Sequence, residues 1–106
     1  MDARKKKRLE TAGWRVGSTA EFLGLSDAES ELIDMRRALS RSLKSRRIKR
    51  RVTQTVLAKQ LRSSQSRVAK MEAGDASVSL DLLIRALLIV GASRTDVAAA
   101  LSARVA

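Results

Sequence analysis

Residues 53–74 read TQTVLAKQLRSSQSRVAKMEAG, and this stretch decides the fold because it contains two short helix patterns in succession. Thr53 is a residue type that caps helix N-termini, and it predicts a first helix over roughly residues 54–61. We expect the apolar side chains of this helix to face inward. These side chains are Val56, Leu57 and Leu61.

A second helix pattern follows directly. Ser64 can cap a helix over roughly residues 65–73, and Gly74 is typical of the position that ends a helix. Val68 and Met71, three residues apart, share one face of this helix and are expected to face inward. Because only about three residues separate the two helices, they must cross steeply, and we predict a helix-turn-helix.

The sequence before this pair predicts the longest helix. "SDAE" at 26–29 matches a capping box, and the apolar residues after it recur at steps of three and four. This stripe consists of Ala28, Leu32, Met35, Leu39 and Leu43. The other face becomes strongly basic, and so dense a run favours a nearby polyanion over a merely solvated face. The basic residues are Arg36, Arg37, Arg41, Lys44, Arg46, Arg47, Lys49, Arg50 and Arg51.

Two more helices are expected after the pair. Ser79 can cap a helix over 80–90 that Gly91 ends, and because this segment is apolar nearly all round we predict a central buried helix. A last helix begins at about Thr95 and carries an apolar stripe at steps of four. The stripe, which either closes the core or forms a dimer seam, consists of Val97, Leu101 and Val105.

Composition narrows the class of protein. The 106 residues carry 22 Lys plus Arg against 11 Asp plus Glu, a formal net charge of +11 that favours polyanionic partners. The chain has no cysteine and no histidine, which removes disulfides, the usual zinc ligands and the usual near-neutral general base. Because the chain has no proline and is rich in helix formers, it is predicted to be all-α. Because it has no histidine, no cysteine and no nucleophile–base arrangement, no enzyme activity and no cofactor are expected.

The N-terminal region is expected to be separate from the rest. We predict a basic arm and short helical extension over 1–25 and a helix-turn-helix domain with a C-terminal helix over 26–106. The arm "MDARKKKR" is either a solvated tail or a source of nonspecific phosphate contacts. The basic N-terminus is not followed by an apolar signal-peptide core, and the longest apolar run, LDLLIRALLIVG, is too short to span a bilayer. The sequence therefore favours a cytoplasmic location without membrane contact.

The segment RRIKRRVTQTVLAKQLRSSQSRVAKMEAG, residues 46–74, resembles the helix-turn-helix of the phage-repressor-like XRE (Cro/C1-type) family. The resemblance rests on T-Q-x-x-L-A, on S-Q-S-x-V-x-x-x-E and on the trailing A-G, and it extends over roughly 39–91. It implies a five-helix phage-repressor-like DNA-binding domain whose second short helix enters the major groove with its N-terminus first.

In that arrangement the side opposite Val68 and Met71 would meet the bases. The residues on it are Gln65, Ser66, Ala69 and Lys70. Gln65 suits an adenine edge, Lys70 suits guanine, and Ala69 suits a thymine methyl group. Phosphate contacts are expected from Gln54, Arg62, Ser64, Arg67 and Arg51. The resemblance also implies an ion pair between Arg47 and Glu72 that fixes the angle of the recognition helix.

The sequence departs from the family pattern at two turns. Arg51 and Arg62 stand where the family usually has glycine, and a left-handed backbone there costs roughly 1 kcal/mol for each residue. We expect phosphate contacts to offset that strain in a DNA complex. Val56 also stands where the family usually has glutamate, so Thr53 lacks a capping-box partner.

Residues 7–43 show a second, weaker resemblance, to antitoxins of the HigA kind, through G-W-x-V-G and E-F-L-x-L-S. It implies a cognate toxin held near Trp14 and Phe22, beside a short helix over 18–23. The alternative is that both aromatic residues pack on the protein's own core or dimer seam. The readings that remain are a homodimeric repressor of a palindromic operator that autoregulates a toxin–antitoxin pair, a protein that mainly masks a toxin, a stand-alone phage-type repressor, and a nonspecific nucleic-acid binder.

Overall fold

The computed structural model describes residues 26–103, and within that range the chain is all-α, as predicted. The helices are α3 (Asp27–Lys49), α4 (Gln54–Gln60), α5 (Gln65–Ala73), α6 (Leu80–Ile89) and α7 (Arg94–Ser102). None of these helices is both long and apolar enough to cross a membrane. The short helix predicted over 18–23 lies outside the described residues, as do Trp14 and Phe22.

The chain divides into two compact units within α3, with the boundary after Ile33. In the first unit, the predicted capping box begins α3. The backbone N–H of Ser26 donates to Oε1 of Glu29 at 2.8 Å, and the N–H of Glu29 donates to Oγ of Ser26 at 3.1 Å. Ala28 is exposed and Leu32 is 40% exposed, so this part of the predicted apolar stripe is not buried.

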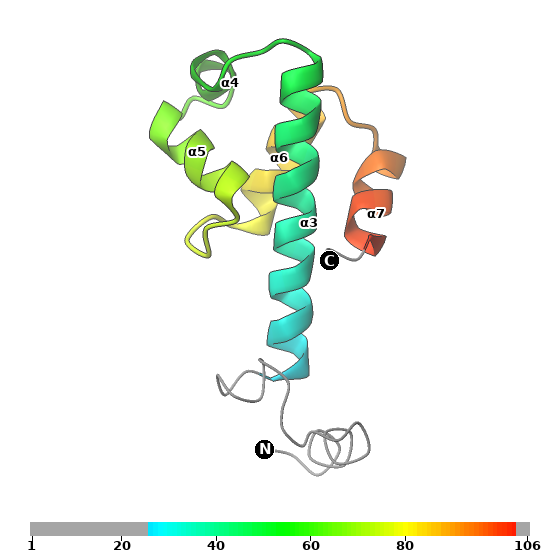
Figure 1. Ribbon diagram of the computed structural model, residues 1–106. Coiled ribbons are helices and arrows are strands. Elements are labelled where there is room, and N and C mark those ends of the chain that lie inside the picture. The colour runs from blue at the N-terminus through cyan, green and yellow to red at the C-terminus, as the bar shows by residue number, and fades with distance from the viewer. Residues whose placement is uncertain (1–25, 104–106) are drawn as a thin grey trace. The chain divides into compact units, whose positions relative to one another are not determined.

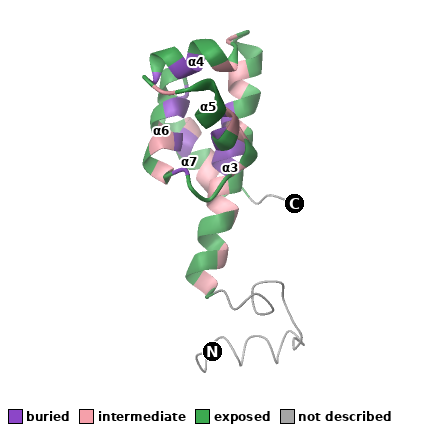
Figure 2. Ribbon diagram, turned by 90° about the vertical axis from the view of Figure 1, so that its left-hand side faces the viewer, coloured by how far each residue is buried: buried purple, intermediate pink, exposed green. Residues whose placement is uncertain are grey.

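The second unit packs around the C-terminal half of α3, where Leu39 and Leu43 are fully buried. Figure 1 shows α4 and α5 on one side of this segment, α7 on the other, and α6 behind it. Figure 2 shows buried segments on several of the helices that pack together in this unit. The largest fully buried side chains are Leu39, Leu43, Leu57, Val68, Met71, Leu83 and Leu87.

Side-chain caps begin α4 and α5 at the predicted positions. Oγ1 of Thr53 accepts from the N–H of Val56 at 3.1 Å, and Oγ of Ser64 accepts from the N–H of Arg67 at 3.2 Å. Gly74 ends α5 in the left-handed region at φ 75°. The predicted inward orientation of Val56 is wrong, because this side chain is 44% exposed. It lies about 100° around the helix from buried Leu57, which places it on the outer side of α4.

Helix α6 is buried along one face rather than all round, which corrects the prediction of a central buried helix. Ser79 caps it as predicted, with Oγ accepting from the N–H of Leu82 at 3.1 Å. Leu83, Ala86 and Leu87 face the core. Leu88, however, is 51% exposed, because the neighbouring helices cover only one side of α6.

Helix α7 closes the core through Val97, which is buried, so the N-terminal part of its apolar stripe packs on the protein's own core. A capping box between Ser93 and Asp96 begins the helix, and the backbone N–H of Ser93 is the main cause that lowers the pKa of Asp96. Asp96 also pairs with Arg46 of α3 at 3.3 Å. Val105, the last residue of the predicted stripe, lies outside the described residues.

Candidate nucleic-acid interface

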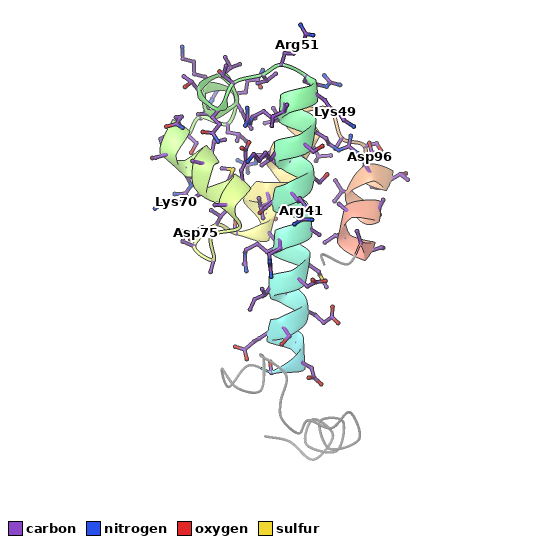
Figure 3. The ribbon with its side chains drawn as sticks, viewed as in Figure 1. Arg41, Lys49, Arg51, Lys70, Asp75 and Asp96 are labelled. Carbon is purple, nitrogen blue, oxygen red and sulfur yellow. The ribbon has the colours of Figure 1, made fainter. Side chains whose placement is uncertain are left out.

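Helix α5 separates its apolar face from its polar face as the sequence predicts. Val68 and Met71 are fully buried against the core. On the other side, Gln65, Ser66 and Lys70 are exposed and Ala69 is half-buried. Figure 3 shows Lys70 on the side of α5 that points away from α3. The four residues predicted to meet bases are therefore brought together on one free face, and their base contacts stay predictions.

The ion pair implied for α3 and α5 is present. Nη2 of Arg47 donates to Oε1 of Glu72 at 2.9 Å, and Nε of Arg47 donates to Oε2. The two side chains are 12% and 3% exposed, so the pair is shielded from solvent. The hydrogen bond to Glu72 raises the pKa of Arg47. Nη1 of Arg47 also donates to the carbonyl of Val52 at 2.9 Å, which ties the pair to the turn before α4.

The pair continues through two glutamines to the outer face of α5. Nε2 of Gln54 donates to Oε1 of Glu72 at 3.0 Å, and Nε2 of Gln65 donates to Oε1 of Gln54 at 2.6 Å. Gln54 thus orients Gln65 in addition to its predicted phosphate contact, for which its backbone N–H at the start of α4 remains suited. Sequence reasoning missed this link, although both glutamines were expected at the N-termini of two crossing helices.

Both turns that depart from the family pattern adopt the left-handed conformation expected of them. Arg51 has φ 58° and Arg62 has φ 55°, and these are the positive values outside glycine among residues 26–103. Both side chains are exposed. In Figure 3, Arg51 projects outward from the turn between α3 and α4. The predicted left-handed conformation is therefore confirmed at both positions. It places an exposed arginine at each of the two turns that flank α4.

A polar hollow of about 140 Å³ lies beside the first half of α5. Its lining residues are Ser64, Ser66, Arg67, Lys70, Ser77 and Val78. The hydroxyl groups of Ser64 and Ser66 lie 3.2 Å apart. Cations, hydroxyl groups and a helix N-terminus together suit a phosphate oxygen. Ser77 is an addition that the sequence did not signal, because it comes from the loop after α5.

The basic run of α3 does not form one uniform face. Arg36 donates to the carbonyl of Val78 at 3.3 Å, and Arg46 and Arg47 form the ion pairs described above. The guanidinium of Arg50 lies against Gly91 and occupies the space that a Cβ would need there. Part of the run therefore holds the fold. Within residues 26–103, no group of three or more side chains suits a metal ion.

Comparison with known proteins agrees with this geometry. A sequence model described as a helix-turn-helix domain matches residues 38–100, which is more than half of the chain. The match begins in α3 and continues into α7, beyond the range of 39–91 in which the sequence resemblance was recognised. No curated protein and no solved structure matches the chain significantly.

Proposed function

Because the chain belongs to the helix-turn-helix domain family, we propose that it is a sequence-specific transcriptional repressor of the XRE type, and not an enzyme. The observation that carries the proposal is the exposed face of α5, whose Gln65 is oriented through Gln54 by the shielded pair of Arg47 and Glu72. A side chain held in position before binding loses less conformational freedom on contact with a base.

In the proposed complex, α5 enters the major groove and Gln65, Ser66, Ala69 and Lys70 read base edges. Gln54, Ser64, Arg67 and the two turn arginines hold the flanking phosphates. One such module offers few base contacts, so the repressor is proposed to bind a palindromic operator as a homodimer in the cytoplasm.

Replacing Gln65 or Lys70 by alanine should weaken operator binding by about 1–3 kcal/mol, or roughly 5- to 150-fold, for each substitution. The cause is the loss of a hydrogen-bonded base contact. The operator is first selected from random duplexes with the full chain, and Kd is then measured by fluorescence anisotropy at fixed salt.

The matched control is Arg85→Ala, which removes one exposed charge from α6, away from the proposed interface. Kd on a random duplex is measured in parallel. Specific readout predicts that Gln65→Ala affects the operator and leaves the random duplex unchanged. If both duplexes lose affinity equally, the protein is a nonspecific nucleic-acid binder instead.

Replacing Arg51 and Arg62 by glycine should have opposite effects on stability and on DNA binding. Release of the left-handed strain is expected to raise the free energy of unfolding by about 0.5–1 kcal/mol for each substitution. Loss of each phosphate contact should lower the salt dependence of operator binding by about one unit of slope. Urea denaturation tests the predicted gain in stability, and a series of operator Kd values at increasing salt concentration tests the predicted change of slope. An unchanged salt slope would remove these arginines from the interface.

We further propose that the repressor is the antitoxin of a toxin–antitoxin pair. This step is supported by the N-terminal resemblance alone, and Trp14 and Phe22, the residues proposed to hold the toxin, lie outside the described residues. The neighbouring gene tests it. A short toxin-like reading frame whose product co-purifies with this chain supports the antitoxin role, and the lack of one favours a stand-alone repressor.

A further inference from the structure

A cavity of about 270 Å³ lies between α3 and the C-terminal end of α5. Its walls are Arg37, Ser40, Arg41 and Lys44 on one side and residues 72–74 on the other. A water molecule takes up roughly 30 Å³ in the liquid, so the cavity has room for a ligand of several non-hydrogen atoms. It is distinct from the polar hollow beside the first half of α5, with which it shares no residue.

The cavity is strongly cationic. Arg37, Arg41 and Lys44 follow one another at steps of four and three, so they project from the same face of α3. Unlike Arg36, Arg46 and Arg47, they form no ion pair or hydrogen bond with another described residue. Figure 3 shows Arg41 midway along α3. All three are exposed, and like charges on neighbouring turns of one helix face repel one another, which an anion bound between them would relieve.

Negative groups near the cavity are already matched. The carboxylate of Glu72 is neutralised by Arg47 and accepts from Gln54. At the end of α5, the carbonyl of Lys70 accepts from the backbone N–H of Asp75 at 3.1 Å. The charge that the cavity offers to a ligand is therefore positive.

One of the residues that line the cavity, Ser40, has a buried hydroxyl group without a hydrogen-bond partner. Ser40 is 3% exposed, and its Oγ has no hydrogen-bond partner. This oxygen lies 3.9 Å from where a Cβ on Gly74 would sit, and Cγ of Arg37 lies 3.8 Å from the same point. Both groups thus meet at Gly74, where the absence of a side chain leaves the cavity open. A buried hydroxyl without a partner is costly, and a ligand oxygen would satisfy it.

We propose that this cavity binds a small multivalent anion made of phosphate groups. Three cations and a hydroxyl group suit several phosphate oxygens at once. DNA is a poorer fit, because α5 is nine residues long and the cavity lies at the end opposite Gln65. That helix separates the two sites by roughly 13 Å.

The anion would act as an effector, a second step that rests on the proposed function. Glu72 lines the cavity and holds Gln54, and Gln54 holds Gln65 on the DNA-facing side. An anion beside Glu72 repels its carboxylate, and this repulsion shifts the position of the glutamines that Glu72 holds. The two sites are then energetically coupled, and operator affinity should change by about 5- to 150-fold at saturation.

The experiment titrates the full chain with inorganic pyrophosphate at constant ionic strength, without DNA. Calorimetry should show saturable binding to one site, and the amide resonances of Ser40 and Gly74 should shift in NMR spectra. Arg37→Gln combined with Arg41→Gln should weaken this binding at least tenfold. The matched control is Arg85→Gln combined with Arg94→Gln, which removes the same charge from exposed positions on α6 and α7 and should retain binding.

Absence of saturable binding, or equal weakening in both double variants, overturns the site. Loss of operator affinity in the Arg37 and Arg41 variant without any pyrophosphate binding overturns it too, and assigns these cations to the DNA backbone. Operator Kd is then measured with and without pyrophosphate. An unchanged Kd overturns the effector step alone, whereas failure to select any operator refutes the repressor and leaves the anion titration valid.

Discussion

Replacing Glu72 by alanine is expected to lower the free energy of unfolding by about 3–5 kcal/mol, a large part of the total for a domain of this size. The substitution leaves Arg47 charged, with a side chain that is only 12% exposed, and without its carboxylate. The penalty comes mainly from that unpaired charge, because the intact pair gains little net energy over an apolar pair of similar volume.

The same substitution should also affect the protein molecules that stay folded, because Gln65 on the recognition helix loses its fixed orientation. Glu72 accepts from both Arg47 and Gln54, so its loss frees the side chain that orients Gln65. We therefore expect the operator affinity of the folded fraction to fall as well. The pair contributes orientation as well as stability, which is a recognised use of buried ionic groups.

Urea denaturation followed by circular dichroism measures the stability change. The control is Asp81→Ala, which removes an exposed carboxylate from the first turn of α6 and should cost no more than about 1 kcal/mol. If Glu72→Ala costs no more than this control, then the pair does not bear on the stability of the domain.

Local chemistry made much of this fold predictable from the sequence. Thr53, Ser64 and Ser79 begin helices where capping residues were recognised, because a cap depends on side chains within three positions of it. The left-handed turns at Arg51 and Arg62, and the pair of Arg47 and Glu72, followed from matching the family pattern position by position.

What the sequence could not supply depends on contacts between distant residues. The bond between Gln54 and Gln65 requires the crossing of α4 and α5 at a particular depth, which no spacing rule gives. The cavity beside Ser40 was missed for the same reason, since its walls come from helices far apart in the chain. Leu88 was expected to be buried because an apolar segment does not reveal how many of its sides are covered.

Val56 and Leu57 show the same limit within one short helix, and they provide the second large prediction. Helix α4 spans only seven residues, so its apolar pattern covers less than two full repeats and does not fix the inward direction. The structure resolves this ambiguity, because Leu57 is fully buried whereas Val56 is 44% exposed.

Leu57→Ala should therefore lower the free energy of unfolding by about 2–5 kcal/mol, from lost burial and from the cavity left where α4 packs on the core. Val56→Ala, one residue earlier on the same helix, should change it by no more than about 0.5 kcal/mol, because an exposed site loses little packing and alanine favours the helix. Urea denaturation of both variants gives the comparison directly. Similar losses at the two positions would mean that α4 is rotated toward the orientation expected from the sequence, with Val56 packed inside.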